Sequence, residues 1–119
     1  MVELANLIGR SVPRPITWMH MPVPIERTDA EFFAPLTGLE LGPLTELYLG
    51  LVHALDGVEG TRRRMQAARK YVQDFGIACE CGISRGRDPN LALEFIKTYG
   101  GGGRALTHCL APALRHYRD

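Results

Sequence analysis

The sequence of 119 residues lacks the patterns that are typical of disulfide-rich, secreted and membrane-spanning proteins. Its three cysteines, an odd number, argue against a disulfide framework. Its first residues lack the basic-then-apolar pattern of a signal peptide. No run approaches the ~20 apolar residues that are needed to cross a bilayer. We therefore expect a cytoplasmic protein with reduced thiols and no membrane partner.

A strong excess of charge is also missing. The chain has 14 Lys and Arg residues against 13 Asp and Glu residues, which gives a formal net charge of +1. Proteins that bind nucleic acids usually carry a clear basic excess, so we expect no nucleic-acid partner. We interpret the one local basic cluster, "TRRRMQAARK" at residues 61–70, as the solvated face of a helix.

The composition is that of a folded domain. Hydrophobic residues make up 45% of the chain and charged residues 23%, which excludes a disordered protein. The length fits one domain. It is, however, about half of the ~250 residues of a complete (β/α)8 barrel.

Three apolar runs predict strands. They are "PITWMHMPV" at residues 15–23, "ELYLGLVHA" at 46–54 and "FGIACEC" at 75–81. Each run is nearly continuous rather than alternating, which is typical of strands that helices cover on both faces in a parallel sheet.

Helical segments precede and separate the first two strands. Residues 3–9 predict a short amphipathic helix that ends at a glycine. Residues 28–36 open with a capping box, in which Thr28 and Glu31 satisfy free amides at a helix start. Pro35 should end or kink this helix, so we expect it to be short.

Two further helices are predicted in the second half of the chain. Residues 56–74 place Asp56 and Glu59 in the same capping arrangement. Residues 88–99 begin with Asp88 as a cap and stop at a run of four glycines, which a helix does not tolerate well.

The predicted elements alternate along the chain. Alternating strands and helices indicate an α/β fold with right-handed crossovers and a parallel sheet. We expect residues 1–99 to form this α/β unit, and residues 100–119 to form a glycine hinge and a carboxyl-terminal tail. A sheet of about three strands leaves two edges open to another chain.

Candidate functional residues lie toward the carboxyl ends of the three predicted strands, where parallel α/β proteins bind their ligands. They are His20, His53 and Cys81. In a functional interpretation, Cys81 is a thiolate zinc ligand, His20 a nitrogen ligand and His53 a proton donor or acceptor. In a structural interpretation, the histidines are hydrogen-bonded in the core and the cysteines pack as small apolar residues.

The end of the third strand, "CEC", leaves three alternatives open: a metal site, a redox pair or core packing. Cys79 and Cys81 share one face of a strand, and Glu80 points to the other. Such a pair is a poor disulfide, and the C-x-x-C pattern of thioredoxin-like proteins is missing.

Two motifs carry a resemblance to a known family. "LVHA", which ends the second strand, and "ECG" (Glu80-Cys81-Gly82), which ends the third, resemble paired motifs of cobalamin-independent methionine synthase and its short relatives. These proteins share a barrel superfamily with uroporphyrinogen decarboxylase. The resemblance covers roughly residues 10–90.

The resemblance implies a (β/α)8 barrel that binds zinc and transfers a methyl or alkyl group to a thiol. It implies that Cys81 matches a zinc ligand and His53 a proton-donating histidine, and that a small-molecule thiol and a methyl donor are the partners. His20 would replace a missing ligand, because Pro22 stands where a cysteine is expected.

Only about three of the eight barrel units are present. We therefore expect a homo-oligomer or a complementing subunit to complete the barrel. The alternative is a non-catalytic α/β remnant that acts as an interaction module.

Overall fold

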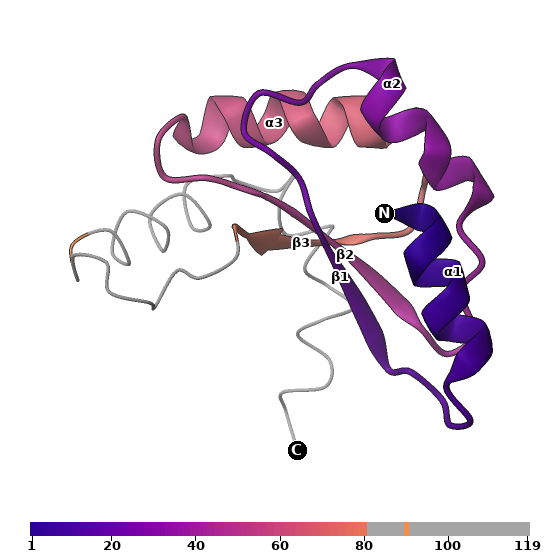
Figure 1. Ribbon diagram of the computed structural model, residues 1–119. Helices are drawn as coiled ribbons and strands as arrows, with labels where there is room; N and C mark the ends of the chain where they lie inside the picture. The colour runs from indigo at the N-terminus through magenta and orange to yellow at the C-terminus, as the bar shows by residue number, and fades with distance from the viewer. Residues whose placement is uncertain (81–89, 91–119) are drawn as a thin grey trace.

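Three parallel strands form one sheet at the centre of the molecule (Figure 1). The computed structural model describes residues 1–80 and Asn90. Strands β1 (Trp18–Pro22), β2 (Glu46–Val52) and β3 (Gly76–Cys79) lie in the order β1-β2-β3, and both pairings are parallel. Each strand falls inside the apolar run that predicted it, so the prediction of parallel βα units is confirmed.

The helices of the described region are α1 (Val2–Ser11), α2 (Ala30–Phe33), the 3-10 helix η1 (Ala34–Gly38) and α3 (Gly57–Ala68). Figure 1 shows α1, α2 and α3 on the same side of the sheet. Right-handed crossovers between strands in sequential order produce this arrangement. We predicted helices on both faces, but those in residues 1–80 cover only one.

The core lies between the sheet and these helices. Along β2, Leu47, Leu49 and Leu51 alternate toward the helices and are almost fully buried. They pack with Phe33 of α2 and Met65 of α3 in one cluster. Burial of each such side chain contributes about 1.5–3 kcal/mol, so the apolar runs that defined the strands also stabilise the helix layer.

The helix starts differ from the predicted capping boxes. Helix α2 is short, as expected, but its N-cap is Asp29, whose carboxylate accepts a hydrogen bond from the Phe32 amide at 2.9 Å. The prediction of Thr28 as the cap was therefore wrong by one residue. Helix α1 also runs past its predicted end to Ser11.

At the start of α3, Asp56 is the N-cap but makes no capping hydrogen bond with its side chain. Its carboxylate binds Arg64 instead, and Glu59 pairs with Arg62. Arg64 is only 1% exposed. The interpretation of residues 61–70 as a solvated face is therefore wrong for Arg64, although Arg62 and Arg63 are exposed.

Some predictions lie outside the described residues. They are Cys81, the helix at 88–99 apart from Asn90, and the hinge and tail at 100–119. Within the part of the chain that the structure describes, no helix is long and apolar enough to cross a membrane.

Candidate functional site

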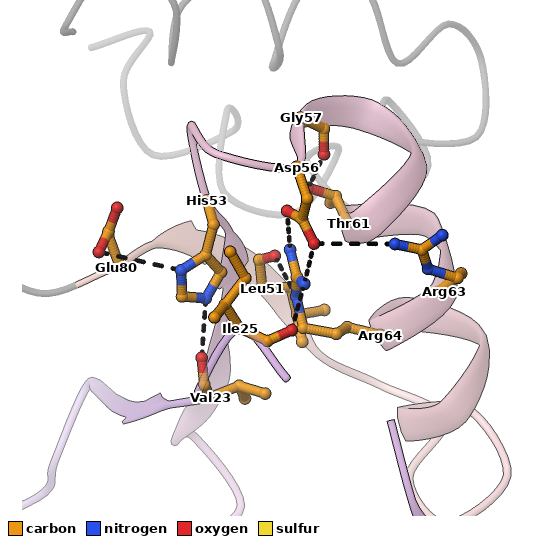
Figure 2. A network of polar contacts seen from close by, with 10 residues as sticks. All are labelled: Val23, Ile25, Leu51, His53, Asp56, Gly57, Thr61, Arg63, Arg64 and Glu80. Carbon is orange, nitrogen blue, oxygen red and sulfur yellow. Dashed lines mark hydrogen bonds and ion pairs between the residues drawn. The ribbon is translucent and has the colours of Figure 1, made fainter. Parts of the chain in front are cut away.

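An extra residue in β2 shapes the carboxyl ends of β2 and β3. Leu49 lies opposite Ile77, but Val52 lies opposite Cys79, so β2 advances three residues while β3 advances two. A β-bulge of this kind redirects the side chains that follow it. In a regular ladder His53 would lie opposite position 81. The extra residue places it beside Glu80 instead (Figure 2).

The imidazole of His53 is held by the backbone of the loop after β1. Its Nε2 lies 2.8 Å from the carbonyl oxygen of Val23, and the residue is 7% exposed. Because a carbonyl oxygen can only accept, Nε2 must carry the proton and donate it. The other ring nitrogen, Nδ1, faces the Glu80 carboxylate at 3.9 Å (Figure 2). In the neutral ring, Nδ1 therefore presents a lone pair toward Glu80.

A buried guanidinium holds this end of the sheet together. Arg64 of α3 donates from Nε to the Leu51 carbonyl at 2.9 Å and from Nη1 to the Ile25 carbonyl at 2.8 Å. It also binds both carboxylate oxygens of Asp56, at 2.6 and 2.8 Å. One side chain thus ties the loop after β1, the bulge in β2 and the start of α3 (Figure 2).

The Asp56 carboxylate is fixed by this pairing. Hydrogen bonding to Arg64 is the largest cause of a lowered pKa for Asp56, against a smaller opposing effect of burial. The turn that leads to Asp56 is closed by the Gly57 amide, which donates to the His53 carbonyl at 3.1 Å. Gly57 has a φ of +53°, a conformation that favours glycine. The backbone of His53 and the Asp56–Arg64 pair therefore belong to one hydrogen-bonded turn at the start of α3.

His20 lies away from His53. Its Cα lies opposite Tyr48, five positions before His53 along the neighbouring strand, which corresponds to roughly 15 Å. The residue after β1 that does contact His53 is Val23. The structure therefore does not bring His20 and His53 together, which differs from the expectation that they share one end of the sheet.

The face of the sheet opposite the helices has two glycines that make room for neighbouring side chains. A Cβ on Gly50 would lie 3.0 Å from Nε2 of His20, and a Cβ on Gly76 would overlap the ring of Tyr48. Nε2 of His20 is buried and has no hydrogen-bond partner in the described region. Burial lowers the pKa of His20, which favours its neutral form.

The predicted metal ligands are only partly visible in the described residues. Cys81 lies outside them, and Cys79 packs against the core. Within residues 1–80 and Asn90, no group of three or more His, Cys, Asp or Glu side chains is placed to hold a metal ion. The sequence-based reasoning passed over Glu80 and Arg64, because neither a bulge nor an arginine that turns inward has a sequence signature.

Two hollows lined by described residues lie away from His53. One of about 620 Å³ opens at the amino ends of β2 and β3, with Glu46, Tyr48 and Asp74 in its wall. Another of about 270 Å³ lies between α1, α2 and the sheet and has a mostly apolar lining. Neither is lined by His53 or Glu80. Ligands of parallel α/β proteins bind at the carboxyl ends of strands, so we place the candidate site at His53.

No protein-family model, no curated protein and no solved structure matches the chain. The resemblance to cobalamin-independent methionine synthase therefore stays a prediction, and the functional argument depends on the geometry around His53.

Proposed function

We propose that this chain takes part in zinc-dependent transfer of a methyl or alkyl group to a thiol. In this proposal its three βα units are a segment of a (β/α)8 barrel that a second copy or a complementing subunit completes. Sequential parallel strands with helices on one face are what such a segment requires. The resemblance of "LVHA" and "ECG" to the methionine synthase motifs supplies the chemistry.

The observation that carries the proposal is the placement of His53. Its ring is held at the carboxyl end of β2 with Nδ1 directed to Glu80, the residue before Cys81. In the proposed transfer, the methyl or alkyl carbon forms a bond to the thiol sulfur as its bond to the donor breaks. The proton that the thiol gives up is taken up by the donor. His53 is the candidate for that proton transfer.

Cys81 and His20 are the proposed zinc ligands. Thiolate and neutral imidazole are both suited to zinc, and the lowered pKa of His20 keeps its ring in the neutral form. Zinc bound to them would keep a substrate thiol ionised at neutral pH. In this proposal the chain supplies zinc ligands and holds the ring of His53 in a fixed orientation.

Zinc content tests the proposal. The full chain is purified without chelator, and zinc per chain is measured by elemental analysis for the native protein and for Cys81→Ser and Cys79→Ser. We expect about one zinc per chain or per oligomer, its loss in Cys81→Ser and its retention in Cys79→Ser, because Cys79 packs in the core. Equal zinc content in the two variants would show that Cys81 is not a ligand.

A second candidate function is that of a non-catalytic interaction module. The observation that favours it is the outer face of α1, where four apolar side chains are exposed: Met1, Leu4, Leu7 and Ile8. Exposed apolar patches often mark contacts with other proteins. A zinc-free chain whose oligomer dissociates in Leu4→Glu would favour this function over methyl transfer.

A further inference from the structure

The outer face of α1 carries a stripe of apolar side chains that are exposed to solvent. Leu4, Leu7 and Ile8 are 61%, 56% and 42% exposed. Positions three and four apart are neighbours on a helix, so these side chains form one continuous stripe. Figure 1 shows α1 at the margin of the helix layer, away from α3. An exposed apolar stripe of this kind often marks a contact with another protein.

Two opposite charges lie on one flank of this stripe. Glu3 is in the first turn of α1 and Arg10 in the last. Seven positions make almost two full helical turns, so the two side chains leave the helix in nearly the same direction. Glu3 has no ion-pair partner among the described residues, whereas Arg10 contacts Glu40 at 3.0 Å on the surface. The flank is therefore negative at one end of the helix and positive at the other.

We propose that α1 is a self-association surface, on which the α1 helices of two copies of this chain pack antiparallel about a two-fold axis. In such a pair the same flank of both helices lies on one side of the contact. The acidic end of each helix then lies beside the basic end of the other, so Glu3 pairs with Arg10 of the other copy twice. The five N–H donors of the guanidinium let Arg10 keep its contact with Glu40.

One position of the two-fold axis fits both the charges and the apolar stripe. The midpoint between Glu3 and Arg10 lies just before Leu7, within the stripe. An axis at this point aligns the opposite charges and places the apolar side chains of the two helices against each other. A partner of unrelated sequence does not require this symmetry, so the pattern favours a second copy of the chain.

Hydrogen bonds from a buried side chain hold α1 on the rest of the domain. Nδ2 of Asn6 donates to the Gly38 carbonyl at 2.8 Å, and its Oδ1 accepts from the Glu40 amide at 2.8 Å. Asn6 and the neighbouring Ala5 are both buried. The outer stripe is therefore presented in a fixed orientation, and association has little backbone left to order.

The contact rests on the second candidate function above, since it names the partner of the same face, and it does not rest on zinc. It joins the helix layers of two copies rather than the edges of their sheets. It is therefore a different contact from the one that would complete a barrel. A single short helix makes a small interface, so we expect a dimer that dissociates at micromolar concentrations.

Sedimentation equilibrium of the full chain tests the proposal. The native chain is compared with Leu4→Glu and with the control Leu55→Glu, which makes the same change at a leucine that is 89% exposed outside α1. We expect the native chain and the control to dimerise alike, and Leu4→Glu to have a dissociation constant at least about tenfold higher. A native chain that stays monomeric up to submillimolar concentrations would overturn the proposal, as would equal dimerisation of the two variants.

Charge reversals test the antiparallel arrangement. Glu3→Lys creates two Lys–Arg contacts in its own dimer, and Arg10→Glu creates two contacts between glutamates. We expect each variant alone to dimerise about three- to thirtyfold more weakly than the native chain. Mixed together, they should form a heterodimer of native-like affinity, because both contacts are attractive again. The contact of position 10 with Glu40 lies within one chain and is unchanged by mixing. A mixture that associates no better than either variant alone would overturn the arrangement.

Zinc content, measured on the same samples, separates this proposal from the proposed methyl transfer. A zinc-free chain that dimerises through α1 supports the contact and removes the zinc-dependent reaction. A zinc-loaded chain that stays monomeric overturns the contact and leaves the proposed zinc ligands in place.

Discussion

The Nε of Arg64 donates a hydrogen bond to the carbonyl oxygen of Leu51 at 2.9 Å. Leu51 lies in the bulge of β2, where the register with β3 shifts. A buried carbonyl without a partner is costly, so this contact stabilises the bulge. Helix α3 thereby stabilises the register that places Glu80, the residue after β3, beside His53.

Replacement of Arg64 should destabilise the fold strongly. Arg64→Met leaves the Asp56 carboxylate without its buried partner and removes the donors for the Leu51 and Ile25 carbonyls. We expect a loss of about 3–5 kcal/mol in the free energy of unfolding, measured by urea denaturation. The neighbouring Arg63 is exposed and lies 4.0 Å from Asp56, so Arg63→Met should change the free energy of unfolding by only about 0–1 kcal/mol. Similar losses in both variants would contradict the assigned role of Arg64.

Stability should depend on pH through Asp56. Its pKa is lowered in the folded state, chiefly by Arg64, so the ionised pair stabilises the protein above the ordinary aspartate pKa of about 3.9. That contribution is lost as the pH falls through the lowered folded-state pKa. Asp56→Asn should flatten the acid limb of the curve of unfolding free energy against pH, relative to Asp29→Asn. An unchanged acid limb would mean that Asp56 does not titrate as described.

Alanine should have opposite effects at two glycines. A Cβ on Gly76 would overlap the Tyr48 ring, so Gly76→Ala should destabilise the protein by about 1–3 kcal/mol. A Cβ on Gly38 meets nothing within 4 Å, so Gly38→Ala should be neutral or stabilising by up to about 1 kcal/mol. Thermal unfolding of both variants checks which of them is less stable. A Gly76→Ala variant as stable as the native protein would show that the Tyr48 ring moves aside for the added methyl group.

His53 and His20 should differ in their ring nitrogens at neutral pH. The contact with Val23 fixes the Nε2–H tautomer of His53 whenever its ring is neutral. The lowered pKa of His20 predicts that its ring loses its proton below the ordinary pH of about 6.5. Long-range 1H–15N correlation spectra across a pH series check both statements. A neutral His53 with its proton on Nδ1 would contradict the Val23 contact.

The strands could be predicted because each one combines two signals. The runs around Met21, Leu49 and Ile77 are apolar and short, and helical patterns separate them, which together indicate parallel βα units. The cap of α2 could not be predicted to the residue, since Thr28 and Asp29 are both good caps and only the backbone path selects Asp29.

The site was only partly predictable. His53 could be found because it follows an apolar strand. Glu80 could not, because the pairing of His53 with Glu80 depends on one extra residue in β2. Arg64 resembled its exposed neighbours Arg62 and Arg63 in sequence, and only its contacts with backbone carbonyls distinguish it.

From the sequence alone we could predict the α/β class, the number of strands in residues 1–80 and the position of His53 after β2. These follow from local patterns of apolar residues, which each segment carries on its own. The tertiary structure alone decided that His20 lies opposite Tyr48 and that His53 faces Glu80. The register between strands depends on contacts that sequence patterns within one segment do not show. Here these contacts are the hydrogen bonds of Arg64 to the Leu51 carbonyl and the Asp56 carboxylate.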